Sequence, residues 1–342
     1  MKAVLIRKHG GPEVLEIADL PKPKAEAGQV VIRVKAAGMN HLDTWVRRGL
    51  PGVTPPLPMV LGSDAAGLIE EIGPGVTGLE AGDRVFVAPG FSCGRCAECC
   101  SGNDPLCRDY GILGEHRNGT QAEYAALPAA NVMSLPDGLS FEEGAAFPLV
   151  FLTAWHMLVG RARVRLGEDV LVQAGGSGVG TAAIQIARLH GARVFTTVGS
   201  DDKMARVREL GAEAAINYRT ADFLEEVRRL TGKRGVDVVI ESIGQQTWER
   251  SLKALARGGR LVTCGATSGY RAETDLRFVF SKGLSLLGST MGSRAELLKI
   301  ARLVGERRLK PVIDRVLPLE RVADGHRAIA ERSLFGKIVL KP

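Results

Sequence analysis

The chain has few aromatic residues and lacks a long apolar run. Only 5% of its 342 residues are Phe, Trp or Tyr, which argues weakly against a surface that stacks sugars or single-stranded bases. No stretch approaches the roughly 18 consecutive apolar residues that a membrane span needs. The segment Met1–Lys8 is short and alternating, unlike the apolar core of a secretory signal. These absences predict a soluble, cytoplasmic protein without membrane partners.

Charge of one sign is also not concentrated anywhere. The formal net charge is +7, but Lys and Arg alternate with Asp and Glu, as in residues 206–209 and 225–229. This pattern is typical of solvated helix faces rather than of a stripe that follows phosphates. We therefore expect no nucleic-acid partner. With 342 residues, 45% of them apolar, the chain can form two domains.

The first 150 residues indicate a β-rich domain. Short alternating or β-branched runs are separated by Gly/Pro clusters such as Gly10-Gly11-Pro12 and Gly73-Pro74-Gly75. The runs predict strands at Lys2–Ile6, Val14–Ile17, Val30–Val34, Leu68–Ile72 and Arg84–Val87.

From Asp169 onward, apolar runs alternate with helical patterns. The expected strands are Val170–Val172, Arg193–Val198, Ala214–Ile216, Val236–Ile240, Arg260–Cys264 and Leu284–Leu287. Six strands with intervening crossovers predict an α/β fold with a doubly wound parallel sheet. The strand-like tail at 336–340 is expected to return to the first domain. The predicted domains are therefore 1–150, with a cysteine-rich lobe near 91–110, then 151–290, and a returning segment 291–342.

Four cysteines follow the spacing C-x2-C-x2-C-x7-C, namely Cys93, Cys96, Cys99 and Cys107. Disulfides or free thiols are the alternative, but clustered cysteines in a reducing compartment favour metal binding. Four sulfur ligands leave no open position, so the pattern predicts one structural zinc per chain. Cys100 could compete with Cys99, although the even spacing favours Cys99.

A glycine-rich turn follows the first strand of the second domain. The run Val170–Ala174 leads into Gly175, Gly176, Ser177, Gly178, Val179 and Gly180, and a helix follows. Glycine allows the tight turn and the close approach of a pyrophosphate to the helix N-terminus. The match to G-x-G-x-x-G is imperfect because Ser177 replaces the second glycine, yet its place between strand and helix predicts a dinucleotide site.

The end of the second strand discriminates between NAD and NADP. Val198 stands where an acidic residue would bind the ribose 2′-hydroxyl of NAD. Ser200 and Lys203 can hold a 2′-phosphate, whereas Asp201 and Asp202 argue against it unless they cap the helix. We favour NADP(H) over NAD(H).

Together these motifs resemble the medium-chain dehydrogenase/reductase superfamily, which includes zinc-containing alcohol dehydrogenases and quinone oxidoreductases. The resemblance covers Met1–Pro342 and includes the segments 36–43 and 82–85, the glycine turn and the closing Gly-Lys-Ile-Val-Leu. It implies a GroES-like catalytic domain, a Rossmann cofactor domain, a cleft between them, a small-molecule substrate, and a homodimer or homotetramer.

The chain departs from the family where catalytic zinc is held. Asn40 stands in place of a cysteine ligand, and a Gly-His-Glu turn reads Gly62-Ser63-Asp64. The third ligand falls in 145–148, which has no cysteine, and Leu42 replaces the hydroxyl that relays the alcohol proton. The Lewis acid is therefore expected to be missing. His41, Asp64 and His156 could form an improvised site, but we favour ordinary roles, with Asp64 in a salt bridge near Arg84.

Other segments, including 40–49 and 198–203, look like the quinone oxidoreductase branch, which passes hydride from NADPH to a conjugated acceptor without metal. By this resemblance Asn40, Asp43 and Thr153 are candidate catalytic residues, and we interpret Asp43 as a structural acceptor rather than a general acid. The resemblance also implies cofactor contacts by Lys203, Tyr218, Ser242, Gly244, Gly265, Ala266, Thr267, Ser289 and Thr290. Two rival hypotheses are a zinc-dependent alcohol dehydrogenase and a dinucleotide-binding redox sensor without turnover.

Overall fold

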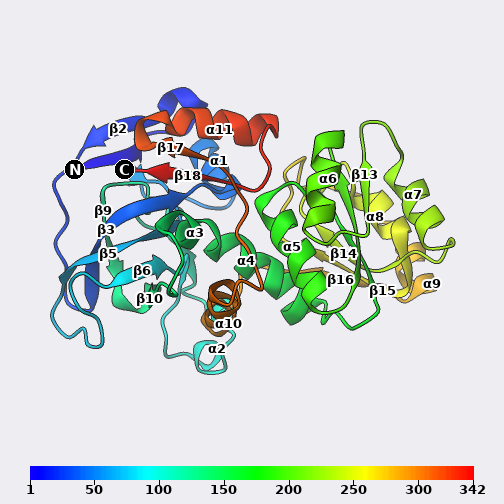
Figure 1. Cartoon of the computed structure of the whole chain (residues 1–342), viewed down its shortest axis with the longest axis horizontal. Helices are drawn as coiled ribbons and strands as arrows, with labels where there is room; N and C mark the ends of the chain where they lie inside the picture. Colours follow the sequence, from blue (N-terminus) through cyan, green and yellow to red (C-terminus); the bar gives the residue numbers. More distant parts are fainter. The chain divides into compact units, whose positions relative to one another are not determined.

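The computed structural model describes residues 1–342 and divides the chain into two compact units (Figure 1). The first unit contains Met1–Leu149 and Ser293–Pro342, and the second contains Val150–Gly292. None of the helices combines the length and the apolar character that a bilayer crossing requires.

The first unit is built on strands that the C-terminal segment completes. Its main sheet has the order β10-β6-β5-β3-β18-β17, and β9 pairs with β3. The closing strand β18 (Lys337–Lys341) runs antiparallel to β3, with Val339 opposite Gly38 and Leu340 opposite Ala37. The other strands of this sheet are β3 (Gln29–Gly38), β5 (Asp64–Ile72), β6 (Arg84–Val87), β9 (Tyr124–Pro128), β10 (Val132–Ser134) and β17 (Ile313–Pro318).

Smaller elements surround this sheet. A three-stranded sheet has the order β2-β1-β4, and β7 pairs with β8 beside the cysteine-rich lobe. The bounds are β1 (Lys2–Ile6), β2 (Glu16–Asp19), β4 (Met59–Val60), β7 (Gly90–Phe91) and β8 (Gly111–Ile112). The helices of this unit are α1 (His41–Arg48), α2 (Ala97–Cys100), α3 (Phe141–Ala146), α10 (Arg294–Gly305) and α11 (Val322–Glu331), with short turns η1 (Pro12–Val14), η2 (Asp104–Leu106), η3 (Ala129–Asn131) and η5 (Leu319–Arg321).

The second unit is a six-stranded, all-parallel sheet in the order β13-β12-β11-β14-β15-β16. This order reverses direction next to β11, as in a dinucleotide-binding Rossmann sheet, and confirms the predicted α/β fold. The strands are β11 (Asp169–Val172), β12 (Arg193–Val198), β13 (Ala214–Asn217), β14 (Val236–Glu241), β15 (Leu255–Thr263) and β16 (Ser285–Gly288). The helices are α4 (Pro148–Trp155), the π-helix η4 (His156–Arg161), α5 (Gly178–Leu189), α6 (Asp201–Glu209), α7 (Phe223–Leu230), α8 (Trp248–Ala254) and α9 (Leu276–Lys282).

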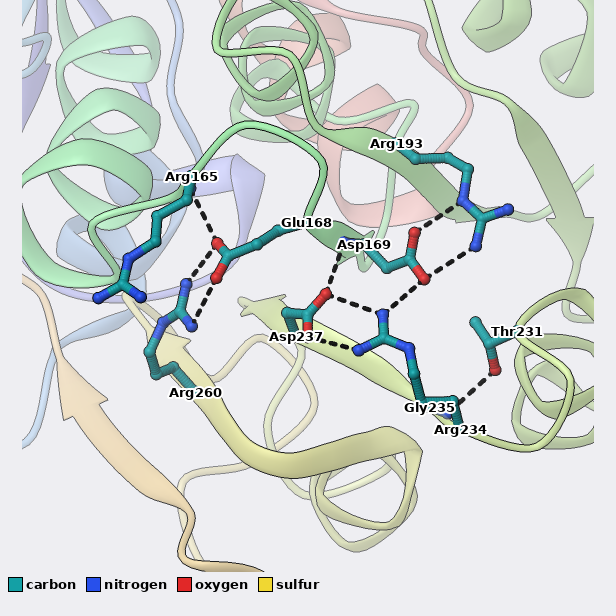
Figure 2. Close-up of polar contacts among 9 residues, drawn as sticks. All are labelled: Arg165, Glu168, Asp169, Arg193, Thr231, Arg234, Gly235, Asp237 and Arg260. Atoms are coloured by element: carbon teal, nitrogen blue, oxygen red, sulfur yellow. Dashed lines mark hydrogen bonds and ion pairs between the residues drawn. The ribbon is translucent and has the colours of Figure 1, made fainter.

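An ion-pair network joins the amino ends of these parallel strands (Figure 2). Asp169 at the start of β11 accepts two hydrogen bonds from Arg193 of β12, at 2.7 and 2.9 Å, and one from Arg234 at 2.8 Å. Arg234 also binds Asp237 of β14 through both of its terminal nitrogens. Arg260 of β15 binds Glu168 in the same bidentate way. Four neighbouring strands are thus tied together at the edge opposite their carboxyl ends.

Candidate functional site

The four predicted metal-binding cysteines lie together in one lobe of the first unit, which we call the four-cysteine lobe. The sulfur atoms of Cys93, Cys96, Cys99 and Cys107 all lie within 4.8 Å of one another. Cys99 Sγ is 3.5 Å from that of Cys96 and 3.9 Å from that of Cys93. A tetrahedral zinc with bonds of about 2.3 Å separates its sulfur ligands by slightly less than 4 Å. The donor set therefore fits a zinc ion.

Local backbone structure positions these sulfurs and favours the thiolate form of Cys93. Backbone N–H groups of Arg95 and Cys96 lower the pKa of the Cys93 thiol to about 6, which favours the thiolate that binds metal. Cys96 precedes α2 and Cys107 follows η2, so two short helical turns place their sulfurs. Cys100 is exposed and its thiol contacts the Arg95 carbonyl, so it lies outside the cluster.

The glycine turn of the second unit has the packing that a dinucleotide site needs. Ser177 caps α5 by accepting a hydrogen bond from the Gly180 N–H at 3.0 Å. A Cβ at Gly180 would lie 2.2 Å from the Ala174 carbonyl oxygen, and one at Gly175 would lie 2.1 Å from Thr196 Oγ1. Neither position tolerates a side chain. The N-terminal amides of α5 can therefore approach a pyrophosphate closely.

Three other predicted cofactor segments meet at the carboxyl ends of the same strands. Thr267 N–H donates to the Ser242 carbonyl at 3.2 Å, which joins the loops after β14 and β15. Ser289 N–H donates to the Thr263 carbonyl, and the buried Ser289 hydroxyl has no protein partner. An unpartnered buried hydroxyl facing no protein acceptor fits the hypothesis that this edge holds a polar ligand.

The end of β12 brings the residues that we expect to distinguish NAD from NADP close to one another. The Tyr218 hydroxyl lies only 2.6 Å from where a Cβ of Gly199 would be, so a larger residue at 199 would displace the tyrosine ring from this position. Asp201 Oδ1 accepts from Asn217 Nδ2 at 2.8 Å. A hydrogen bond from the Ser200 hydroxyl lowers the pKa of Asp202. Both aspartates lie in the first turn of α6, where acidic residues are stabilised by the helix dipole.

A buried polar cluster surrounds Asn40 in the first unit. Asn40 Nδ2 donates to Asp64 Oδ2 at 2.9 Å, and Lys337 Nζ donates to Asn40 Oδ1 at 2.5 Å and to Asp64 Oδ2 at 3.2 Å. Asp43 accepts from the Asn40 backbone N–H at 2.8 Å and from Gln121 Nε2 at 3.0 Å. None of these five side chains is more than 4% exposed. We call these five residues the Lys337 cluster.

Burial dominates the electrostatics of the Lys337 cluster. It raises the pKa of Asp43 to about 7, raises the pKa of Asp64 and lowers the pKa of Lys337. The attraction between Lys337 and the two carboxylates opposes these shifts. Our expectation that Asp64 pairs near Arg84 is wrong: Asp64 pairs with Lys337, and Arg84 instead donates to the Leu139 carbonyl.

Thr153 is the third predicted catalytic residue, and four further buried polar residues were not predicted as site residues. Thr153 lies on α4, is 6% exposed, and its hydroxyl is 4.0 Å from the sulfur of Met291. Lys337 was only part of a strand motif in the sequence, and Gln121 carried no signal. Gln173 directly follows β11 and Glu241 is the last residue of β14, and both are buried. These two residues did carry a signal, because a polar residue at the end of an apolar run is rarely buried without a partner.

Comparisons with known proteins agree with this arrangement. A family profile described as an alcohol dehydrogenase GroES-like domain matches residues 26–137, and one described as a zinc-binding dehydrogenase matches residues 178–306. The chain is 33% identical to a human quinone oxidoreductase over 99% of this chain and 97% of that protein.

Solved structures extend the likeness to both units. A crystal structure titled as an NAD-dependent alcohol dehydrogenase is 54% identical, covers all of both chains and superposes with a TM-score of 0.96. The quinone oxidoreductase of Escherichia coli, solved in complex with NADPH, is 30% identical, again over all of both chains, with a TM-score of 0.86. The chain therefore belongs to the medium-chain dehydrogenase/reductase superfamily and is an NAD(P)-dependent oxidoreductase.

Proposed function

We propose that the protein reduces quinones or α,β-unsaturated carbonyls with NAD(P)H and uses no catalytic metal. The observation that carries this proposal is the Lys337 cluster. Asn40 and Asp64 stand where zinc-dependent relatives are expected to have a cysteine ligand and the Gly-His-Glu turn. Here the two side chains bind each other and the Lys337 ammonium. A metal ion would have to displace a buried cation that already neutralises Asp64.

The donor set supports the same proposal. Zinc in proteins is held by Cys, His and carboxylate ligands, usually at least three of them. One group of three or more such side chains converges in the structure, and it is the four-cysteine lobe. In the Lys337 cluster the amide of Asn40 and one shared carboxylate oxygen face an ammonium instead. Such a set favours a fixed hydrogen-bond network over metal binding.

We assign Asn40 the role of a fixed hydrogen-bond donor toward the substrate oxygen. Lys337 can only donate and an ionised Asp64 can only accept, so the orientation of the Asn40 amide is determined. One Nδ2 hydrogen goes to Asp64, and the second is available for a developing enolate or phenolate oxygen. Asp43 holds the Asn40 backbone at the start of α1. Thr153 is assigned to the nicotinamide side.

Bound NAD(P)H supplies the hydride, which is two electrons and one proton, and a second proton completes the hydroquinone or the saturated carbonyl. The chain has to orient the acceptor, exclude water and stabilise the oxygen that becomes negative. A conjugated acceptor spreads this charge, so a hydrogen-bond donor can replace a Lewis acid.

We assign one structural zinc per chain to Cys93, Cys96, Cys99 and Cys107. A bound zinc crosslinks the lobe and contributes to folding. Replacing Cys96 by Ser should lower the melting temperature, whereas Cys100→Ser, which changes a cysteine outside the cluster, should not. An unchanged melting temperature in the Cys96 variant would remove the structural role.

We propose that NADP(H) is preferred. The two solved relatives differ in the cofactor that their titles name, so the choice depends on this chain's residues. Val198 offers no carboxylate to the ribose, Asp201 is bound to Asn217, and Ser200 and Lys203 lie at the start of α6. Lys203→Ala should therefore reduce the preference of NADPH over NADH by about tenfold. Tighter binding of NADH by the unmodified protein would reverse this assignment.

We also propose a homo-oligomer through the edge of the second unit. Strand β16 ends the sheet, its Leu286 is 37% exposed, and Phe280 on α9 is 74% exposed. An edge strand with one unpaired side and exposed apolar neighbours can bind a second copy of the chain. Light scattering should return a mass of two or four chains, and Phe280→Glu should lower it. A single-chain mass in the unmodified protein would contradict this proposal.

The substrate class is tested by following NADPH oxidation with a naphthoquinone, with an α,β-unsaturated ketone and with a simple aldehyde. The proposal predicts fast turnover of the first two, insensitive to EDTA and to added zinc. Asn40→Ala should lower kcat by about 10²–10³ while NADPH affinity stays nearly unchanged. An unchanged kcat would remove Asn40 from the mechanism even if the reaction class survives.

A zinc-dependent alcohol dehydrogenase is the second candidate, because the 54% identical structure carries an alcohol dehydrogenase title. It predicts efficient oxidation of ethanol or a larger alcohol and loss of this activity when EDTA removes a metal ion. The same assays therefore separate the two candidates.

A further inference from the structure

We infer that Gln173, Ser251 and Glu241 form a hydrogen-bond chain that holds two dinucleotide loops in register, which makes them positioning residues for the cofactor. The inference needs only dinucleotide binding, which the family establishes, and not the proposed substrate.

The hydrogen-bond chain is continuous from the glycine turn to the interior of the second unit. The Ala174 N–H donates to Thr197 Oγ1 at 3.0 Å, and the Thr197 hydroxyl donates to Gln173 Oε1 at 2.7 Å. Gln173 Nε2 donates to Ser251 Oγ at 3.1 Å, and the Ser251 hydroxyl donates to Glu241 Oε2 at 2.7 Å. A single series of hydrogen bonds thus links Ala174, which immediately precedes the glycine turn, with the Glu241 carboxylate at the end of β14.

Glu241 then organises the second loop. Its Oε1 accepts from the backbone N–H of Ile243 at 2.7 Å and of Gly244 at 3.1 Å. Its Oε2 also accepts from the Thr247 hydroxyl at 2.9 Å. Gly244 has φ +85°, and a Cβ there would lie 2.6 Å from the Gly269 carbonyl oxygen. The carboxylate therefore fixes a turn that only glycine can make at this point.

The direction of the hydrogen bonds explains why the chain is rigid. Every donor points toward Glu241, and the terminal acceptor is a carboxylate that accepts only from neutral donors in this network. Successive bonds of one direction polarise each other and strengthen the series. Gln173, Thr197, Ser251 and Glu241 are all at most 2% exposed, so water cannot replace a missing partner. Removing the Ser251 link leaves Gln173 Nε2 without an acceptor and leaves Glu241 Oε2 with the Thr247 hydroxyl as its donor.

The location of the hydrogen-bond chain indicates a role in cofactor binding rather than in general stability. It joins the glycine turn after β11 to the loop after β14, on the two sides of the point where the strand order reverses. Dinucleotides bind at this point in doubly wound sheets. The chain touches neither the four-cysteine lobe nor the ion pairs at the amino edge. Its effect should therefore appear in cofactor binding.

The main test uses Ser251→Ala, which removes one hydroxyl that contacts neither loop. We expect the Kd values for NADPH and for NADH to rise by about tenfold, because the buried Gln173 amide loses its acceptor and the path to Glu241 is broken. Hydrogen exchange in the ligand-free protein should accelerate at the Ala174 amide and at the Gly244 amide, which lie at opposite ends of the chain.

Two further variants distinguish positioning from a structural role. Thr231→Val removes a partly buried hydroxyl elsewhere in the same unit, whose bonds are to Val227 and to Gly235 at the amino edge. It should lower the melting temperature and leave both Kd values unchanged. Gln173→Leu breaks the chain one link earlier, so the double variant with Ser251→Ala should bind no more weakly than either single variant.

The inference is overturned if Ser251→Ala lowers only the melting temperature, as Thr231→Val does. It is also overturned if the Gln173 and Ser251 variants have additive effects on Kd, because additive effects mean independent sites. Accelerated exchange at only one end of the chain would likewise contradict a continuous link.

Discussion

The two charged networks of the molecule use similar residues but shift pKa values in opposite directions. At the amino edge of the second unit, burial raises the pKa of Asp169, but hydrogen bonds from Arg193 and Arg234 lower it below its ordinary value. In the Lys337 cluster, burial outweighs the ion pair and raises the pKa of Asp64. The same Asp–cation pairing therefore has two electrostatic outcomes.

The cause is access to water and the number of cations that face each carboxylate. The side chains of Arg193 and Arg234 are 46% and 49% exposed, and each binds in a bidentate manner. Lys337 has a side chain that is 4% exposed and is the cation between two carboxylates. The amino-edge pairs retain hydration and stabilise the sheet. The Lys337 cluster keeps charged groups in an apolar interior, which is typical of functional sites.

Removing the cation should have the largest effect. Lys337→Met leaves the buried Asp64 without its cationic partner and should lower the free energy of unfolding by about 3–5 kcal/mol at pH 7. Lys341→Met, on the same strand but with an exposed side chain, should cost less than about 1 kcal/mol. Chemical denaturation measures both. Equal effects of the two variants would show that the cluster is not electrostatically distinct.

A charge-neutral double variant sharpens this result. Lys337→Met combined with Asp64→Asn removes both charges and should recover part of the lost stability. It should not restore kcat, because the orientation of the Asn40 amide is no longer fixed. Full recovery of kcat would mean that the cluster acts only through stability.

At the amino edge a smaller effect is expected. Asp169→Asn replaces one acceptor oxygen by a donor facing an arginine and should lower the free energy of unfolding by about 1–3 kcal/mol, with kcat unchanged. Glu226→Gln, which removes an exposed i,i+3 pair in the same unit, should cost less than about 1 kcal/mol. If kcat falls in the Asp169 variant, the edge is not purely structural.

The smallest expected effect is a difference in pH dependence. The pKa of Asp43 is raised to about 7, so the folded state binds an extra proton, and this group makes stability fall as pH rises from about 4 to 7. The lowered pKa of Asp169 acts in the opposite way: its stabilisation is present above about pH 4 and is lost on acidification.

Asp43→Asn isolates the first of these contributions. Its free energy of unfolding should change less between pH 5 and pH 7 than that of the unmodified protein, by about 1 kcal/mol or more. Asp169→Asn should instead flatten the curve below pH 4. Identical slopes between pH 5 and 7 with and without Asp43 would show that Asp43 stays ionised in this range.

The sequence predicted the second unit in detail because its strands are local apolar runs. Arg193–Val198 matches β12 residue for residue, and the structure places β11, β13, β14 and β16 within one or two residues of the expected bounds. Strand β15 begins at Leu255, five residues before the predicted start at Arg260, because Gly258 and Gly259 interrupt the apolar pattern. Helix α9 was not predicted.

The candidate site was predicted only where spacing carries information. Cys93, Cys96, Cys99 and Cys107 are close in sequence, so their convergence could be inferred, and the structure brings their sulfurs together. Lys337 and Asp64 are 273 positions apart, and only the return of β18 to the first unit brings them into contact. The direct roles assigned to Asn40, Asp43 and Thr153 stay predictions.

The zinc content of the active protein tests the central claim most directly. The account predicts one zinc per chain, retained in the four-cysteine lobe after treatment with EDTA, with full NADPH-dependent reduction of a quinone. Elemental analysis and the activity assay on the same sample decide the matter. Two zinc ions per chain, with activity lost when the weaker one is removed, would contradict a site built around Lys337 instead of a metal.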